Sequence, residues 1–245
     1  MKAILFAASA AVLTVLACAA PSTAADPLVV SDIAWKATPA EGRSDAHFRL
    51  SHKGSTSDIS LDGDRDEFDA VRTALQGAAG PVSFSVVHEA GVLACDGTLT
   101  KAQAGSGNCR FTSDPAFEAA LRERGLAPER RSDLIAMLMV DATIALADGL
   151  TEAGVKPEDN DDLIAAAALE VTPAYVSDLR SEAMVLTAVE DAIALKALDV
   201  DGAYVRGLAA AGYKGLSAHD VVGMKAMGVS PQYAQAMNAA AGRAR

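Results

Sequence analysis

Apolar and polar residues alternate along short segments in the first half of the chain. The alternation is clearest in residues 47–52 (HFRLSH), 57–61 (SDISL) and 82–88 (VSFSVVH). Because successive side chains of a strand point to opposite faces, this pattern predicts strands with one buried face. Between them, Phe68, Val71 and Leu75 have the spacing of one helix face. We therefore expect residues 26–114 to form a small antiparallel sheet of four or five strands with one helix.

From Asp114 onward the pattern changes to that of helices, and it repeats with a period of 29 residues. A large apolar or aromatic residue recurs at Phe117, Leu146, Tyr175, Tyr204 and Tyr233, and a second one at Leu121, Leu150, Leu179, Leu208 and Met237. An aspartate recurs at Asp133, Asp162, Asp191 and Asp220. Such self-similarity is typical of stacked helical repeats. The predicted fold class is α+β: a small antiparallel β-rich domain, residues 26–114, followed by four and a half two-helix repeats, residues 115–245.

Each repeat carries signals for the start and end of its helices. Thr172-Pro173, Asp201-Gly202 and Ser230-Pro231 place a capping side chain before a first helical residue, and two of those residues are proline. Gly212 is suited to end the first helix of its repeat in the left-handed conformation. The second helix opens at Ser217-x-x-Asp220, which resembles a capping box with Asp in place of Glu.

The N-terminus has the pattern of a secretory signal peptide. Lys2 is followed by the uncharged apolar run Ala3–Ala17 and then by small residues up to Ala25. Cleavage after Ala24 or Ala25 removes residues 1–25 and implies a periplasmic or secreted protein. Val15-Leu16-Ala17-Cys18 also resembles a lipobox, so the alternative is a lipoprotein of the outer or inner membrane that is anchored through Cys18.

Cys95 and Cys109 lie in two segments that read as one hairpin, residues 92–100 and 105–112. A turn centred on Ala102 places the two cysteines opposite each other. In an oxidising compartment this arrangement predicts a structural disulfide. Two free thiols or a redox pair are the alternatives, although no C-x-x-C motif is present.

Composition narrows the classes of partner. The chain has 245 residues and a formal net charge of −11, which argues against binding to nucleic acid or to an anionic membrane surface. Only 4% of the residues are aromatic, which suits closely packed small helices better than a large ligand cavity. After the signal segment, no apolar run approaches the ~18 residues of a membrane span.

Residues 213–233 (YKGLSAHDVVGMKAMGVSPQY) resemble the tandem repeats found beside BlaR1-type antirepressor peptidases and in secreted bacterial relatives that lack the peptidase. The matching positions are Asp220, Lys225, Gly228-Val229, Pro231 and Tyr233, with a looser match at Asp191, Lys196, Val200 and Tyr204. Residues 80–117 resemble the β-region that precedes those repeats. The chain has no H-E-x-x-H motif, so peptidase activity does not carry over. The resemblance implies an envelope or regulatory accessory protein.

No motif predicts a catalytic residue, a cofactor or a metal site. Asp62-x-Asp64-x-Asp66 begins like a calcium loop, but Glu67 and Thr73 stand where Gly and Glu are required. The acidic run of residues 158–162 falls between two predicted helices, where carboxylates cap a helix. The histidines, at positions 47, 52, 88 and 219, lack the spacing of zinc ligands.

Two hypotheses follow. The first is a non-catalytic protein-interaction module with an unidentified protein partner in the cell envelope. Its candidate interaction face comprises basic residues at related positions of the repeats, namely Arg180, Lys196, Arg206 and Lys225. The second is a small-ligand-binding protein or enzyme whose site lies between the β-rich domain and the first repeats. Convergence of His47, His88 and Asp62–Asp66 in a cleft would favour the second hypothesis.

Overall fold

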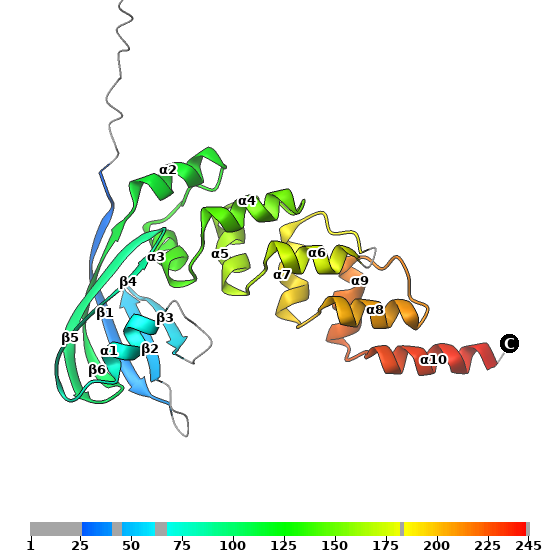
Figure 1. The fold of residues 1–245 in the computed structure, drawn as a ribbon, viewed down its shortest axis with the longest axis horizontal. Coiled ribbons are helices and arrows are strands. Elements are labelled where there is room, and N and C mark those ends of the chain that lie inside the picture. Colours follow the sequence, from blue (N-terminus) through cyan, green and yellow to red (C-terminus); the bar gives the residue numbers. More distant parts are fainter. Residues whose placement is uncertain (1–25, 41–45, 62–67, 182–183, 244–245) are drawn as a thin grey trace, which may run out of the picture.

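The computed structural model describes residues 26–40, 46–61, 68–181 and 184–243. The predicted signal peptide, Cys18 and the acidic residues Asp62–Asp66 lie outside these ranges. The described chain is an α+β protein, as predicted, with a curved sheet from which a series of helices extends (Figure 1).

The sheet has six antiparallel strands in the order β3-β2-β1-β6-β5-β4. Their bounds are β1 Val29–Pro39, β2 Ala46–His52, β3 Ser55–Ser60, β4 Gly80–His88, β5 Gly91–Lys101 and β6 Ala104–Ser113. The sequence predicted four or five strands, and the additional one is β1, which lies in the middle of the sheet. Its alternation is interrupted because the register shifts between Val30 and Ile33, where Asp32 has a φ of +64°.

The centre of the sheet is packed around Trp35 of β1. The Trp35 ring contacts Phe48 and Phe84, with ring centroids 6.1 and 5.3 Å away, and its Nε1–H donates to the carbonyl of Asp96 at 3.1 Å. Gly97 and Gly107 face each other on β5 and β6, and a Cβ on either would lie within 2.6 Å of the indole. These two glycines provide the room in which the ring lies.

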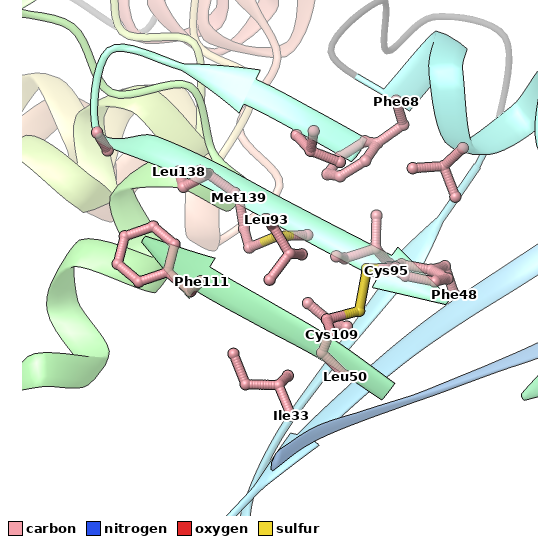
Figure 2. Close-up of a cluster of buried hydrophobic side chains, with 14 of the residues drawn as sticks. Ile33, Phe48, Leu50, Phe68, Leu93, Cys95, Cys109, Phe111, Leu138 and Met139 are labelled. Atoms are coloured by element: carbon pink, nitrogen blue, oxygen red, sulfur yellow. A yellow bond between two sulfur atoms is a disulfide. The ribbon is translucent and has the colours of Figure 1, made fainter. Parts of the chain in front are cut away.

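Cys95 and Cys109 are directly opposite each other on β5 and β6, which confirms the predicted register. Their sulfur atoms are 2.01 Å apart, a distance compatible with a disulfide bond (Figure 2). The pair is buried in the same cluster as Leu93 and Phe111 of the sheet, and Leu138 and Met139 from helix α3, Arg131–Met139, point into that cluster.

Removing this disulfide should destabilise the protein measurably. Closing a loop of 14 residues restricts the unfolded chain by about 3 kcal/mol, and the double variant Cys95→Ala/Cys109→Ala loses that restriction. We expect its free energy of unfolding to fall by about 2–4 kcal/mol in urea titrations. The wild-type protein in reductant is the control, and an unchanged midpoint after complete reduction would contradict the prediction.

Ten helices are described. Helix α1, Asp69–Leu75, lies between β3 and β4 in the sequence, and its Val71 and Leu75 join the sheet core. The other nine follow β6, as four pairs and a last single helix. Their bounds are α2 Pro115–Glu123, α3 Arg131–Met139, α4 Ile144–Glu152, α5 Asn160–Ala168, α6 Pro173–Ser181, α7 Val189–Ala197, α8 Gly202–Ala210, α9 Ala218–Ala226 and α10 Pro231–Arg243. Each even-numbered helix contacts the next even-numbered helix, and from α3 onward each odd-numbered helix contacts the next odd-numbered one.

The predicted helix caps are confirmed. The side chains of Thr172, Asp201 and Ser230 accept the backbone N–H of the third helical residue, at 3.1, 2.7 and 3.1 Å. Ser217 and Asp220 form a reciprocal capping box. Gly212 follows α8 with a φ of +98°, as expected for a left-handed helix end.

The hydrophobic core is continuous from the sheet into the first helices. One cluster of buried residues includes Trp35 and Phe111 of the sheet together with Leu121, Leu138 and Leu163 of α2, α3 and α5. Two further clusters follow along the helices, and the last is built on Leu208, Ala211 and Ala234. Within the described ranges, no single helix has the length and apolarity to cross a membrane; α3 and α4 meet the criteria only jointly and are bent by 82°.

Candidate functional site

Three of the four recurring aspartates, Asp133, Asp162 and Asp220, accept hydrogen bonds from residues just before their helices. Asp133 accepts the backbone N–H groups of Glu129 and Arg130 at 3.2 and 2.9 Å, and Asp162 accepts that of Glu158 at 2.9 Å. Burial raises the pKa of Asp162, whereas hydrogen bonds from Ser217 lower that of Asp220. These carboxylates therefore hold the loops that precede α3, α5 and α9.

Two of the recurring tyrosines, Tyr175 and Tyr204, each bond to the loop that leads into the next even-numbered helix. The Tyr175 hydroxyl donates to the carbonyl of Val200 at 2.7 Å, and the Tyr204 hydroxyl donates to that of Val229 at 2.6 Å. Burial raises the pKa of both phenols. Each ring also lies under a lysine: Lys196 Nζ is 5.0 Å from the Tyr175 centroid, and Lys225 Nζ is 4.7 Å from that of Tyr204.

All four basic residues of the candidate interaction face contact other parts of the chain. Arg180 donates to the carbonyls of Ala153 and Gly154 at 2.5 and 3.3 Å. Arg206 lies 3.4 Å from the carboxylate of Asp178, and Lys225 donates to the Asp199 carbonyl at 2.9 Å. With Lys196 over Tyr175, the four side chains link neighbouring helices, so a partner on this face would compete with internal contacts.

A second group of polar contacts joins the sheet to the helices. In the turn between β4 and β5, Glu89 accepts the backbone N–H of Ile144, the first residue of α4, at 2.9 Å. The neighbouring His88 places its Nδ1 2.8 Å from the carboxylate of Asp141 in the loop before α4. This turn therefore fixes the position of α4 relative to the sheet. We call it the junction clamp.

Breaking the junction clamp should weaken the attachment of α4. Glu89→Ala leaves the Ile144 N–H without its acceptor, and we expect a loss of about 1 kcal/mol in the free energy of unfolding. Hydrogen exchange should rise in α4 more than in the sheet strands. Glu123→Ala, an exposed carboxylate on α2, is the control. Equal stability of both variants would contradict the assignment.

A cleft of about 290 Å³ lies where the sheet meets α3 and α5. Its apolar lining includes Ile33, Leu50, Ile135 and Ile164, and its polar lining includes His52, Ser57, Ser132 and Asp161. Arg130 is also part of the lining, with Nε 3.0 Å from Asp133 and Nη2 3.2 Å from Asp161. Asn160, which is buried, donates to Asp133 at 3.0 Å. The cleft is therefore amphipathic, with its acidic groups paired to one arginine.

The residues proposed for a ligand site do not converge among the described parts of the chain. His47 lies on strand β2 beside Asp58 at 3.7 Å, away from the cleft lining, whereas His88 belongs to the junction clamp on β4. His219 is exposed on α9. Of the four histidines, only His52 lines the cleft. No group of three or more His, Cys, Asp or Glu residues within the described ranges could hold a metal ion.

The second hypothesis placed a ligand site between the β-rich domain and the first repeats, but sequence reasoning did not identify the residues that line this cleft. Its lining comes from β1, β2, β3, α3 and α5, so it joins residues that are as much as 131 positions apart, such as Ile33 and Ile164. No local motif marks such a set. Comparison with family models, with curated proteins and with solved structures gives no match to this chain.

Proposed function

We propose that this chain is a secreted bacterial cell-envelope protein that acts as a non-catalytic protein-interaction module, built on 29-residue two-helix repeats. The even-numbered helices begin at Pro115, Ile144, Pro173, Gly202 and Pro231, and the odd-numbered ones at Arg131, Asn160, Val189 and Ala218. This regular spacing supports the repeats. The leader-like pattern of residues 1–25 supports export.

The observation that carries the interaction role is the extended row of helices (Figure 1). Stacked helical units commonly bind partners along such a surface. In this chain the recurring tyrosine, lysine and arginine side chains bond to neighbouring helices and loops. These bonds hold successive helices at fixed positions relative to one another. The function of the row is then to present side chains at fixed separations.

Charge indicates the chemistry of the partner. Residues 140–203 contain 14 Asp and Glu residues but only three Lys and Arg residues. Exposed examples are Glu152, Glu170 and Glu190. A partner with a basic surface would be attracted to this row, and salt would weaken the complex. The resemblance to antirepressor-associated repeats suggests a role accessory to envelope-stress or antibiotic-response signalling.

In-cell crosslinking of the exported protein tests this function. The full chain is compared with Glu152→Gln/Glu170→Gln/Glu190→Gln, which removes three charges from the acidic row, residues 140–203. The control, Asp26→Asn/Glu123→Gln/Glu129→Gln, removes three charges outside that row. Truncation at residue 114 is avoided because it would open the shared core. A specific partner lost only in the first variant supports the proposal, whereas no partner, or equal capture by all three, counts against it.

The cleft supports a second candidate function, the binding of a small ligand. Its volume suits a molecule of modest size, and it combines an apolar lining with a few polar groups. Thermal-shift screening of small metabolites tests this role, with Ser57→Trp as the variant that fills the cleft. A ligand that stabilises wild type but not the variant supports binding, and the absence of any such ligand removes this function.

The location also has a direct test. Mass spectrometry of the mature protein distinguishes cleavage near Ala25 from lipidation at Cys18. A mature chain that begins at Asp26 supports a periplasmic or secreted protein, and an acylated Cys18 supports the lipoprotein alternative.

A further inference from the structure

Helix α10 has an apolar stripe that no described part of the chain covers. Tyr233, Ala236, Met237 and Ala240 are exposed and follow the i, i+3, i+4, i+7 spacing of one helix face. Tyr233 and Met237 are 56% and 51% exposed. A different side of α10 faces α8, where Ala234 is buried.

Earlier helices show what normally covers these positions. Tyr204 precedes Tyr233 by 29 residues, and its hydroxyl bonds to the loop that leads into α10. Leu208 precedes Met237 by 29 residues and is fully buried. The equivalent face of α8 is therefore covered by α10, the next even-numbered helix. The stripe on α10 has the residues of a helix–helix interface without the second helix.

We propose that the stripe binds the same stripe of a second copy, so that two α10 helices pack antiparallel about a two-fold axis. In such a pair with its axis between positions 236 and 237, Tyr233 faces Ala240 of the other copy, and Ala236 faces Met237. Each large side chain then meets a small one, which allows close packing of the helices. Met and Tyr are also enriched in protein interfaces.

The segment that carries the stripe is uncharged. Residues 231–242 contain no Asp, Glu, Lys or Arg, although the whole chain carries a net charge of −11. Two copies that meet through α10 therefore avoid bringing their acidic rows, residues 140–203, against each other. A contact through the acidic row itself would be opposed by like charge.

Sedimentation equilibrium of the full mature chain over a range of concentrations tests the dimer. We expect wild type to dimerise and Met237→Glu to dimerise at least tenfold more weakly, because two carboxylates would be buried in the interface. Gln235→Glu adds the same charge on a different side of α10 and should dimerise like wild type. Circular dichroism checks that all three proteins are folded.

Cysteine crosslinking tests the register independently. Tyr233→Cys/Ala240→Cys should form disulfide-linked dimers on oxidation, whereas Gln232→Cys/Gln235→Cys should not. A monomer at every concentration overturns the proposal. So does a dimer that Met237→Glu leaves intact, or a monomer whose stripe binds vesicles of anionic phospholipid. None of these outcomes depends on the partner sought by crosslinking above.

Discussion

The Trp35→Ala protein is expected to unfold with a free energy about 3–5 kcal/mol below that of wild type. Trp35 is 1% exposed on a strand in the middle of the sheet. Its removal leaves a cavity between Phe48, Phe84 and the two opposed glycines, Gly97 and Gly107. Those glycines cannot fill the space, because neither has a side chain. The Asp96 carbonyl also loses the indole donor.

Urea titration followed by circular dichroism measures this loss, because Trp35 is the only tryptophan and the variant lacks its fluorescence. Trp35→Phe is the control. It keeps an aromatic ring in the site but removes the Nε1–H, so it should lose less stability than Trp35→Ala. A loss below about 1 kcal/mol for Trp35→Ala would show that the surrounding strands close over the cavity.

The second large effect concerns a glycine between helices. Glycine-to-alanine changes inside helices ordinarily stabilise by up to about 1 kcal/mol. Gly207→Ala on α8 should instead destabilise by about 1–3 kcal/mol. A Cβ at this position would lie 2.6 Å from Cβ and 2.8 Å from Cγ of Pro231, the first residue of α10. A proline ring cannot rotate away, so the two helices must separate.

Gly223→Ala on α9 is the matched control, because no atom beyond the neighbouring backbone of its own helix lies within 4 Å of the added Cβ. Gly223→Ala should stabilise the protein, whereas Gly207→Ala should destabilise it. The opposite signs of the two stability changes separate the effect of close packing from that of helix propensity. Urea titrations of both variants measure the difference. Two changes of the same sign would contradict the close approach of α8 and α10.

The spacing of chemically distinctive residues predicted several features of the fold. The two cysteines and one short turn were sufficient for the register of β5 and β6. Thr172, Asp201, Ser230 and Ser217 predicted helix starts, because a capping side chain acts on backbone only two or three residues away. Strand β1 was not predicted, because the register shift at Asp32 interrupts the alternation of its buried and exposed residues.

The candidate sites depend on contacts over long distances in sequence, and these have no local signal. Glu89 reaches α4 across 55 residues, and the cleft joins three strands to two helices. Conversely, the basic residues Arg180, Lys196, Arg206 and Lys225 were predicted as a face for partners from their spacing alone. The spacing could not show that each also contacts a neighbouring helix, because the direction of a long side chain depends on what packs beside it.

The three buried clusters imply that different parts of the molecule open with different ease. The first joins the sheet to α2, α3, α4 and α5, so these elements should lose their protection from hydrogen exchange together, in the slowest opening event. The last has only Leu208, Ala211 and Ala234 at its centre. Helix α10 should therefore detach and reattach many times during one global unfolding, and any molecule that covers its outer stripe would slow that local opening.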